Sequence, residues 1–171
     1  RSYNKALELY RLAHSKGDDF AAYMEARYLA EGVVFPADPI AAHEKFMALA
    51  NKGLAPAQNA IGVDFQTGTG GVQKDFGEAF KWFMLAAIKG EPNAQSQVGT
   101  MLKDANSEKF SPKESVEWFR KGATAGNLNA QCNLAYAYLN GIGVKADLQQ
   151  ALKLLKLAAN NGAYYCQLQL G

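Results

Sequence analysis

The sequence predicts an all-α protein, a solenoid of stacked antiparallel helix pairs, and three observations support this fold class. Glycines recur at spacings of 36 or 37 residues along the chain. The segments on either side of each glycine place apolar residues at the i, i+3, i+4 and i+7 spacing of a helix with one buried face. No segment shows the alternation of a half-buried strand. Because one helix pair cannot bury its apolar faces alone, neighbouring pairs must stack.

Three columns of residues define the repeat. The repeat glycines are Gly17, Gly53, Gly90, Gly126 and Gly162. The small residues eleven positions before them are Ala6, Ala42, Ala79, Ser115 and Ala151. The large apolar residues seven positions before them are Tyr10, Phe46, Phe83, Phe119 and Leu155. Five segments of the chain share these three columns at one period, which indicates an array of repeats.

The helix that ends at each repeat glycine has predictable ends. Residues suited to the N-cap, whose side-chain oxygen accepts a first-turn N–H, are Ser2, Asp38, Asp75, Ser111 and Asp147. The residues placed to complete a capping box with three of these caps are Glu78, Glu114 and Gln150. The glycine suits the left-handed position that ends a helix.

The helix that follows each glycine carries its own buried column, as at Ala94, Val98 and Leu102. A small residue follows the middle apolar one in every repeat. These small residues are Ala26, Gly62, Gly99, Ala135 and Gly171. A position of this kind allows a neighbouring helix to approach closely, so we expect a close helix contact at each.

The repeat phase divides the chain into one array over 1–171. Its parts are an orphan helix at 2–17, full repeats at 18–53, 54–90, 91–126 and 127–162, and a partial repeat at 163–171. We expect the array to be part of a larger protein. The two ends carry apolar residues that terminal repeats normally replace with polar ones, so a covering partner or end-to-end self-association is expected. These residues are Leu7, Leu9 and Tyr10 at one end and Tyr164, Tyr165, Leu168 and Leu170 at the other.

Composition excludes several function classes as starting points. A net charge of +2 is too small to indicate binding to nucleic acid. The longest apolar run, Trp82 to Ile88, is far shorter than the roughly 18–20 residues of a membrane span, so no span is predicted.

No catalytic, cofactor or metal site is predicted. The turn at Gly68-Thr69-Gly70-Gly71 lacks the lysine of a phosphate-binding loop and joins two helices, so we interpret it as structural. His14 and His43 stand outside metal-ligand spacing and are interpreted as solvated or packing residues. The stripe of Trp82, Trp118, Phe83 and Phe119 is interpreted as core because it repeats in one column.

Residues 130–162, AQCNLAYAYLNGIGVKADLQQALKLLKLAANNG, resemble the Sel-one-like repeat, a relative of the tetratricopeptide repeat. Residues 57–90 carry the same Ala-Gln, apolar-Gly, Gly-x-Gly-Val, Trp-aromatic and Ala-Ala pattern. The resemblance implies a right-handed solenoid that acts as a protein-interaction scaffold. Relatives act in bacterial secretion, envelope assembly, host interaction, signalling and endoplasmic-reticulum degradation complexes. Periplasmic, secreted, endoplasmic-reticulum and cytoplasmic locations therefore all stay open.

The two cysteines do not match the known staple of this family. A cysteine-rich branch, with proposed β-lactam-related activity, pairs the second Ala of the Ala-Ala column with the Ala of the next Ala-Gln column. Cys166 occupies the second of these columns, but Ala159 occupies the first, and Cys132 lies in another column. We therefore expect both cysteines to be small buried hydrophobic residues rather than a staple.

The resemblance and the residues favour a non-catalytic scaffold that binds a protein or peptide. Three alternatives remain: an enzyme, a structural spacer, and an enzyme-associated or cell-envelope regulator of the same family. The scaffold hypothesis places binding on a concave groove lined by the helix after each glycine. Its variable columns, six, ten and thirteen positions after the glycine, contain Tyr23, Asn59, Ser96, Cys132, Arg27, Val63, Thr100, Tyr136, Gln66, Lys103 and Leu139. An ordinary variable surface would look the same.

Overall fold

The computed structural model describes residues 2–34, 36–163 and 166, and over these residues the chain forms nine α-helices and no strand. The helices are α1 (Ser2–His14), α2 (Asp19–Glu31), α3 (Pro39–Asn51), α4 (Ala55–Thr67), α5 (Phe76–Ile88), α6 (Pro92–Lys103), α7 (Pro112–Thr124), α8 (Leu128–Asn140) and α9 (Leu148–Asn160). The predicted all-α repeat fold is confirmed. We call α2, α4, α6 and α8 the first helices of the repeats, and α3, α5, α7 and α9 the second helices.

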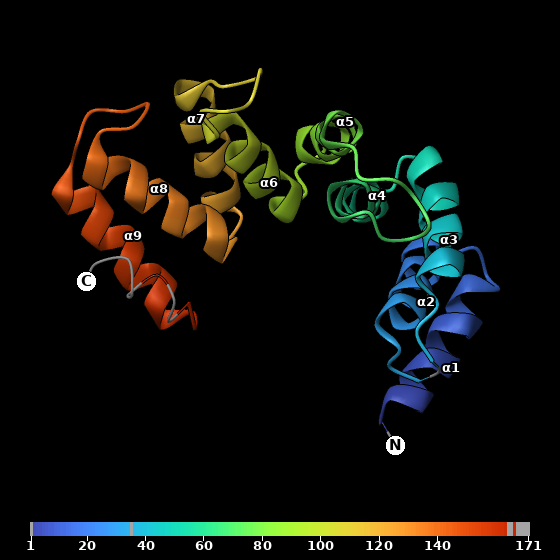
Figure 1. Ribbon diagram of the computed structural model, residues 1–171. Helices are drawn as coiled ribbons and strands as arrows, with labels where there is room; N and C mark the ends of the chain where they lie inside the picture. The colour runs from blue at the N-terminus through green and yellow to red at the C-terminus, as the bar shows by residue number, and fades with distance from the viewer. Residues whose placement is uncertain (1, 35, 164–165, 167–171) are drawn as a thin grey trace. The chain divides into compact units, whose positions relative to one another are not determined.

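The chain divides into two compact units, 1–86 and 87–171. In the first unit each of α1, α2 and α3 packs against the helix that follows it (Figure 1). In the second unit the same holds for α6, α7 and α8, and the first helices α6 and α8 also contact each other. The division of the chain into repeats of one array stays a prediction.

The second helices, and α1 before them, end as the sequence predicts. The five repeat glycines have φ between 85° and 93°, a left-handed conformation that a side chain would strain. At Gly53 the backbone N–H donates to Ala50 O at 2.9 Å, and the N–H of Leu54 donates to Leu49 O at 3.1 Å. This pair of bonds is a Schellman motif, which satisfies carbonyls that the helix leaves without partners.

The N-caps of the second helices are confirmed at three aspartates, whereas the capping boxes are wrong. Asp38, Asp75 and Asp147 accept a hydrogen bond from the backbone N–H three residues on. Ser111 makes no side-chain cap bond. A capping box needs the cap residue's own N–H, but at Asp75 that N–H donates to Phe65 O at 2.8 Å. The backbone N–H groups of the other three caps, Asp38, Ser111 and Asp147, likewise donate to a carbonyl of the preceding first helix.

The core lies between first and second helices. Of the predicted columns, the small residues from Ala42 onward and the large residues from Phe46 onward are all buried. The close approach expected at the small positions is confirmed at Gly62 and Gly99, whereas Gly171 lies outside the described residues. A Cβ added at Gly62 would lie 2.6 Å from the ring of Phe83, and one added at Gly99 would lie 2.6 Å from the ring of Phe119. Each aromatic ring therefore packs directly on the backbone of the preceding first helix.

Three buried glutamines tie the first helices α4, α6 and α8 to the helix before each of them. The side-chain Nε2 atoms of Gln58, Gln95 and Gln131 donate to backbone carbonyls eight residues earlier, at 3.2–3.3 Å. Each of these carbonyls also accepts the N–H of the repeat glycine, as Ala123 O does from Gly126. The Oε1 atoms of the three glutamines are buried without a hydrogen-bond partner among the described residues. The Nε2 donor of each glutamine thus constrains the angle between its own first helix and the helix before it.

The N-terminal end of the array is partly covered. Leu7 is buried, and the ring of Tyr10 meets that of Tyr28 edge-on at 5.8 Å, whereas Leu9 is 58% exposed. The apolar residues named for the C-terminal end, Tyr164, Tyr165, Leu168 and Leu170, lie outside the described residues. End-to-end self-association stays a prediction.

Replacing Gly99 by Ala is expected to lower the free energy of unfolding by about 1–2 kcal/mol, because overpacking against Phe119 outweighs the gain in helix propensity. Urea denaturation followed by circular dichroism measures this change. Gly77→Ala is the matched control, since its added Cβ would meet only the Asp75 side chain, at 3.2 Å. Equal stability of the two variants would contradict the contact.

Replacing Gln131 by Glu is expected to cost about 3 kcal/mol at pH 7, because a carboxylate there is buried beside a carbonyl and cannot donate. Burial raises the pKa of the introduced group above its unfolded value of about 4.3. The loss should therefore be small below pH 4.3 and should grow as the pH rises through the folded pKa. Gln131→Met, which keeps the size without a charge, should show a smaller loss that does not change with pH.

Candidate functional site

The structure spreads the eleven predicted groove residues over three environments. Lys103 and Tyr136 are exposed, and Tyr136 is 43% exposed. Ser96 and Cys132 are buried. The half-buried ones are Tyr23, Arg27, Asn59, Val63, Gln66, Thr100 and Leu139. The columns at ten and thirteen each hold one exposed residue and no buried one, so both are more accessible than the column at six.

The prediction was wrong for Ser96 and Cys132, which are each 5% exposed and cannot contact a partner. The reason is helix geometry. The position six residues after the glycine lies at the flank of the exposed face, about 70° from the centre of the stripe formed by positions three, seven, ten and fourteen, because each residue turns the helix by about 100°. In α8 this flank faces the segment that follows α9, so Cys132 joins the core cluster that contains Leu155.

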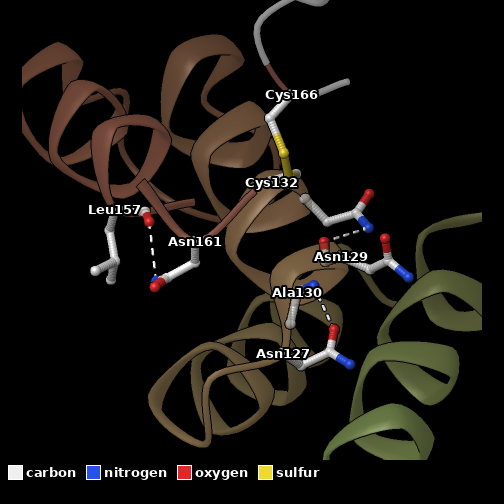
Figure 2. Close-up of a disulfide and its surroundings, with 8 residues drawn as sticks. Asn127, Asn129, Ala130, Cys132, Leu157, Asn161 and Cys166 are labelled. Atoms are coloured by element: carbon white, nitrogen blue, oxygen red, sulfur yellow. Dashed lines mark hydrogen bonds between the residues drawn. A yellow bond between two sulfur atoms is a disulfide. The ribbon is translucent and has the colours of Figure 1, made fainter. Parts of the chain in front are cut away.

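A disulfide joins Cys132 on α8 to Cys166, with the Cα atoms 5.6 Å apart (Figure 2). Both residues are buried, as predicted, but the expectation of two unlinked cysteines was wrong. The pairing uses the column six positions after one glycine and the column four positions after the next. The sequence held the signal in the separation of 34 residues, two fewer than one repeat.

The accessible columns that the sequence reasoning missed lie three, seven and fourteen positions after the glycine, and of these the column at fourteen is exposed in every repeat whereas the column at seven is half-buried in every repeat. With the column at ten, they follow the i, i+4, i+7, i+11 spacing of a single helix stripe. On α8 this stripe is Asn129, Asn133, Tyr136 and Asn140. Of these four, Asn133 is half-buried and the others are exposed.

The stripe has a different chemistry in the two units. In the second unit it is rich in side-chain amides, with Asn93 and Gln97 on α6 beside those of α8. In the first unit the same columns hold mainly apolar residues, among them Phe20, which is 53% exposed. Arg27 there pairs with Glu31 at 2.7 Å, and this hydrogen bond raises the pKa of Arg27.

Side-chain hydrogen bonds connect the amide residues of α6 and α8. Asn127, the N-cap of α8, accepts from the N–H of Ala130 (Figure 2) and donates through Nδ2 to Asn93 Oδ1 at 2.9 Å. Asn133 Nδ2 donates to the backbone carbonyl of Asn129, also at 2.9 Å. An open depression of about 480 Å³ lies at this end of the two helices, lined by residues 92–93 and 125–129.

Lys103 lies at the other end of α6. Its Nζ donates to Asn133 Oδ1 at 2.5 Å and lies 5.9 Å from the centre of the Phe119 ring. Partial burial lowers the pKa of this lysine. Among the described residues no carboxylate lies within ion-pair distance of it. Lys103 is therefore a cation held by an amide rather than by an opposite charge.

A second polar cluster lies in the first unit, beside the turn that follows α4. His43 Nδ1 and Asp64 Oδ2 are 2.7 Å apart, and Thr69 donates to the other oxygen of Asp64 at 2.8 Å. A Cβ on Gly70 would lie 2.7 Å from His43, so the turn packs on the imidazole. The interpretation of His43 as a packing residue and of residues 68–71 as a structural turn is confirmed.

The described part of the chain holds neither a metal-ligand cluster nor a membrane-spanning helix. Its His, Cys, Asp and Glu residues form no group of three that could hold a metal ion. None of its helices is long and apolar enough to cross a membrane.

The family model of the Sel1 repeat matches residues 1–18, 55–91, 92–127 and 128–162, which is more than half of the chain. The chain belongs to the Sel1 repeat family. Members of this family typically act in protein–protein interactions and are generally non-catalytic. Residues 19–54 lie between two of the matched segments.

Solved structures of Sel1 repeat proteins have the same fold. A protective antigen of uropathogenic Escherichia coli with an SLR fold is similar with a TM-score of 0.83 and 31% identity, over 96% of this chain and 35% of that one. A Sel1 repeat protein from Oxalobacter formigenes is similar with a TM-score of 0.80 and 26% identity, over 94% of this chain and 63% of that one.

Chitin synthase regulator SKT5 of Saccharomyces cerevisiae is 28% identical over 146 residues, which are 82% of this chain and 21% of the regulator. The chain spans less than a third of the length of the curated relatives it matches.

Reduction of the disulfide is expected to lower the free energy of unfolding by about 2–4 kcal/mol, because it removes a cross-link between residues 34 positions apart. Thermal denaturation with and without dithiothreitol measures the loss. The double variant Cys132→Ser, Cys166→Ser should be equally destabilised and should no longer respond to the reductant. Two unreacted thiols in the oxidised protein, measured by alkylation and mass spectrometry, would contradict the bond.

Proposed function

We propose that this chain is a non-catalytic interaction scaffold that binds a protein or peptide through the exposed stripes of its first helices. The observation that carries the proposal is the contrast between buried and exposed columns. Buried columns hold nearly the same residue in each repeat, as at Ala57, Ala94 and Ala130, because every interface between helices is alike. The stripe is mainly apolar in one unit, apart from Arg27, Glu31 and Thr67, and rich in amides in the other, as expected when each surface suits its own ligand.

The yeast relative gives a second candidate function. Its name describes a regulator of chitin synthase. A role as a regulatory subunit, in which the scaffold binds an enzyme without doing chemistry, agrees with the same surface. Such a regulatory role would distinguish this chain from a structural spacer, because a spacer needs no exposed binding residues.

The disulfide adds a proposal about location. Disulfides persist in secreted, periplasmic and endoplasmic-reticulum proteins and are rare where glutathione keeps thiols reduced. The bond between Cys132 and Cys166 therefore supports an oxidising compartment over a cytoplasmic one.

The test is capture of partners on the immobilised chain from an extract of the source cells, followed by mass spectrometry and affinity measurement with the purified partner. Arg27→Ala in the first unit and Tyr136→Ala in the second are tested as separate variants. At least one should weaken binding by about 1–2 kcal/mol, because Arg and Tyr are enriched at binding hot spots. Unaltered circular dichroism shows that the variants fold.

The matched control changes the exposed face of a second helix, with Leu152→Ala and Lys153→Ala on α9. This variant should bind the partner as the original chain does. If the control loses affinity while the other variants keep it, the binding surface lies on the second helices. If nothing is captured specifically, the chain is a spacer and the proposal fails.

A further inference from the structure

We propose that two histidine–carboxylate pairs in the first unit determine which helices pack together, and so prevent copies of the chain from stacking on one another out of register. This inference goes beyond the proposed function, because it holds for whichever partner the scaffold binds. We call the contact between a helix that ends at a repeat glycine and the first helix that follows it a junction. The two junction pairs are His14 with Glu25, between α1 and α2, and His43 with Asp64, between α3 and α4.

In each junction pair a carboxylate is the more buried or an equally buried partner. His14 Nδ1 lies 3.1 Å from Glu25 Oε2, and His43 Nδ1 lies 2.7 Å from Asp64 Oδ2. The side chains of Glu25 and Asp64 are 13% and 15% exposed, whereas that of His14 is 48% exposed. An imidazole that carries a proton on Nδ1 donates to the carboxylate whether the ring is neutral or charged. A carboxylate at this depth is costly unless such a donor lies beside it.

The first junction pair stands in two columns that are apolar in the second unit. His14 lies three positions before its repeat glycine, and Glu25 lies eight positions after that glycine. At the α7–α8 junction the same two columns hold Ala123 and Leu134, which belong to one core cluster. A polar pair therefore replaces an apolar contact at α1–α2.

The second junction pair stands in a different pair of columns. His43 lies ten positions before its repeat glycine, and Asp64 lies eleven positions after it. At α7–α8 these columns hold Val116 and Ala137, again in one core cluster. The two junctions of the first unit thus differ from each other and from the apolar α7–α8 junction.

A helix that packed at the wrong junction would separate these pairs. If α7 of one copy packed on α4 of another, Val116 would face Asp64, whose carboxylate would lose its imidazole. If α1 packed on α4, Leu7 would take the place of His43 beside Asp64. Removal of one partner from a buried pair of this kind is strongly destabilising, because the other is left without compensation. The native order of helices satisfies both pairs.

Other groups around the carboxylates belong to the same junctions. Arg11 on α1 places Nε 3.8 Å from Glu25 Oε1, an atom without a hydrogen-bond partner among the described residues. The charge of Glu25 therefore depends on two residues of α1. Thr69, in the turn after α4, donates to Asp64 Oδ1 at 2.8 Å, and the same turn packs on the ring of His43.

The register of a repeat protein needs such a device because its apolar interfaces are alike. Columns filled by alanine and one large residue let a helix fit several sites in the same or another copy. Domain swapping and misassembly are characteristic failures of repeat chains. A polar pair within an apolar core penalises the wrong partner more than it stabilises the right one, which is how natural sequences specify one register.

The first experiment refolds the full chain from urea as an equal mixture of copies labelled at the N-terminal amine with a donor or an acceptor dye. Energy transfer measures the fraction of chains in intermolecular assemblies. The fourfold variant His14→Ala, Glu25→Leu, His43→Val, Asp64→Ala gives the first unit the residues of the α7–α8 junction. It should keep its helical circular dichroism and form intermolecular assemblies roughly tenfold more often than the parent chain, since the penalty for mispairing is gone.

The second experiment measures whether a junction pair acts as a unit. His43→Val alone leaves the Asp64 carboxylate beside an apolar side chain and should lower the urea midpoint of unfolding by about 1 M. Addition of Asp64→Ala to that variant should restore most of the lost midpoint, because it removes the uncompensated carboxylate.

The matched control removes the ion pair between Lys52 and Asp19, with Lys52→Ala and Asp19→Ala. Its Nζ and Oδ1 atoms are 2.6 Å apart, and both side chains are exposed, so no buried charge is left behind. This variant should form intermolecular assemblies as rarely as the parent chain.

Three results would overturn the inference. The fourfold variant fails to fold or assembles between copies no more than the parent, His43→Val is as stable as the double variant, or the control assembles as much as the fourfold variant does. None of these results bears on the scaffold proposal, which depends on capture of a partner and on the Arg27 and Tyr136 variants.

Discussion

The contact on which the structure depends is the seating of one large side chain on the backbone of the preceding first helix. Phe83 on Gly62 and Phe119 on Gly99 are its tightest cases, because a methyl group at either glycine would overlap the ring. In two other repeats the small residue of this column is Ala26 or Ala135. There the helices leave room for the alanine Cβ, and the alanine lies in the same core cluster as the large residue, Phe46 or Leu155. The helix pair can form only where this column stays small.

Hydrogen bonds then set the angle between helices that the aromatic contact brings together. The Schellman motif at Gly17, Gly53, Gly126 and Gly162 turns the chain, and the buried amide of Gln58, Gln95 or Gln131 bonds to a carbonyl that also accepts the N–H of a repeat glycine. A buried donor without a partner is costly, so alternative packings that break these bonds are disfavoured. The repeated buried glutamine therefore gives specificity to a core made largely of alanine.

Because the buried residues lie on one side of each first helix, as Ala57, Gln58, Ile61 and Gly62 do on α4, the opposite stripe is open to variation. The two units use this freedom differently, since one presents apolar residues and the other presents amides around a lysine. A rigid scaffold with variable faces can change its ligand without changing its fold. The disulfide adds a covalent bond at the C-terminal side of α8, where Ala163 and Cys166 join the core.

The sequence by itself determined the helices, their ends, the core columns and the family, because a period of 36 or 37 residues repeats each local signal several times. It predicted Asp75 as a cap but not the bond from its N–H to Phe65, which replaces the capping box. Only the tertiary structure decided that Cys132 lies against Cys166 and that Ser96 is buried. Such flank positions depend on which neighbouring element covers them, and the pattern of one helix carries no such information.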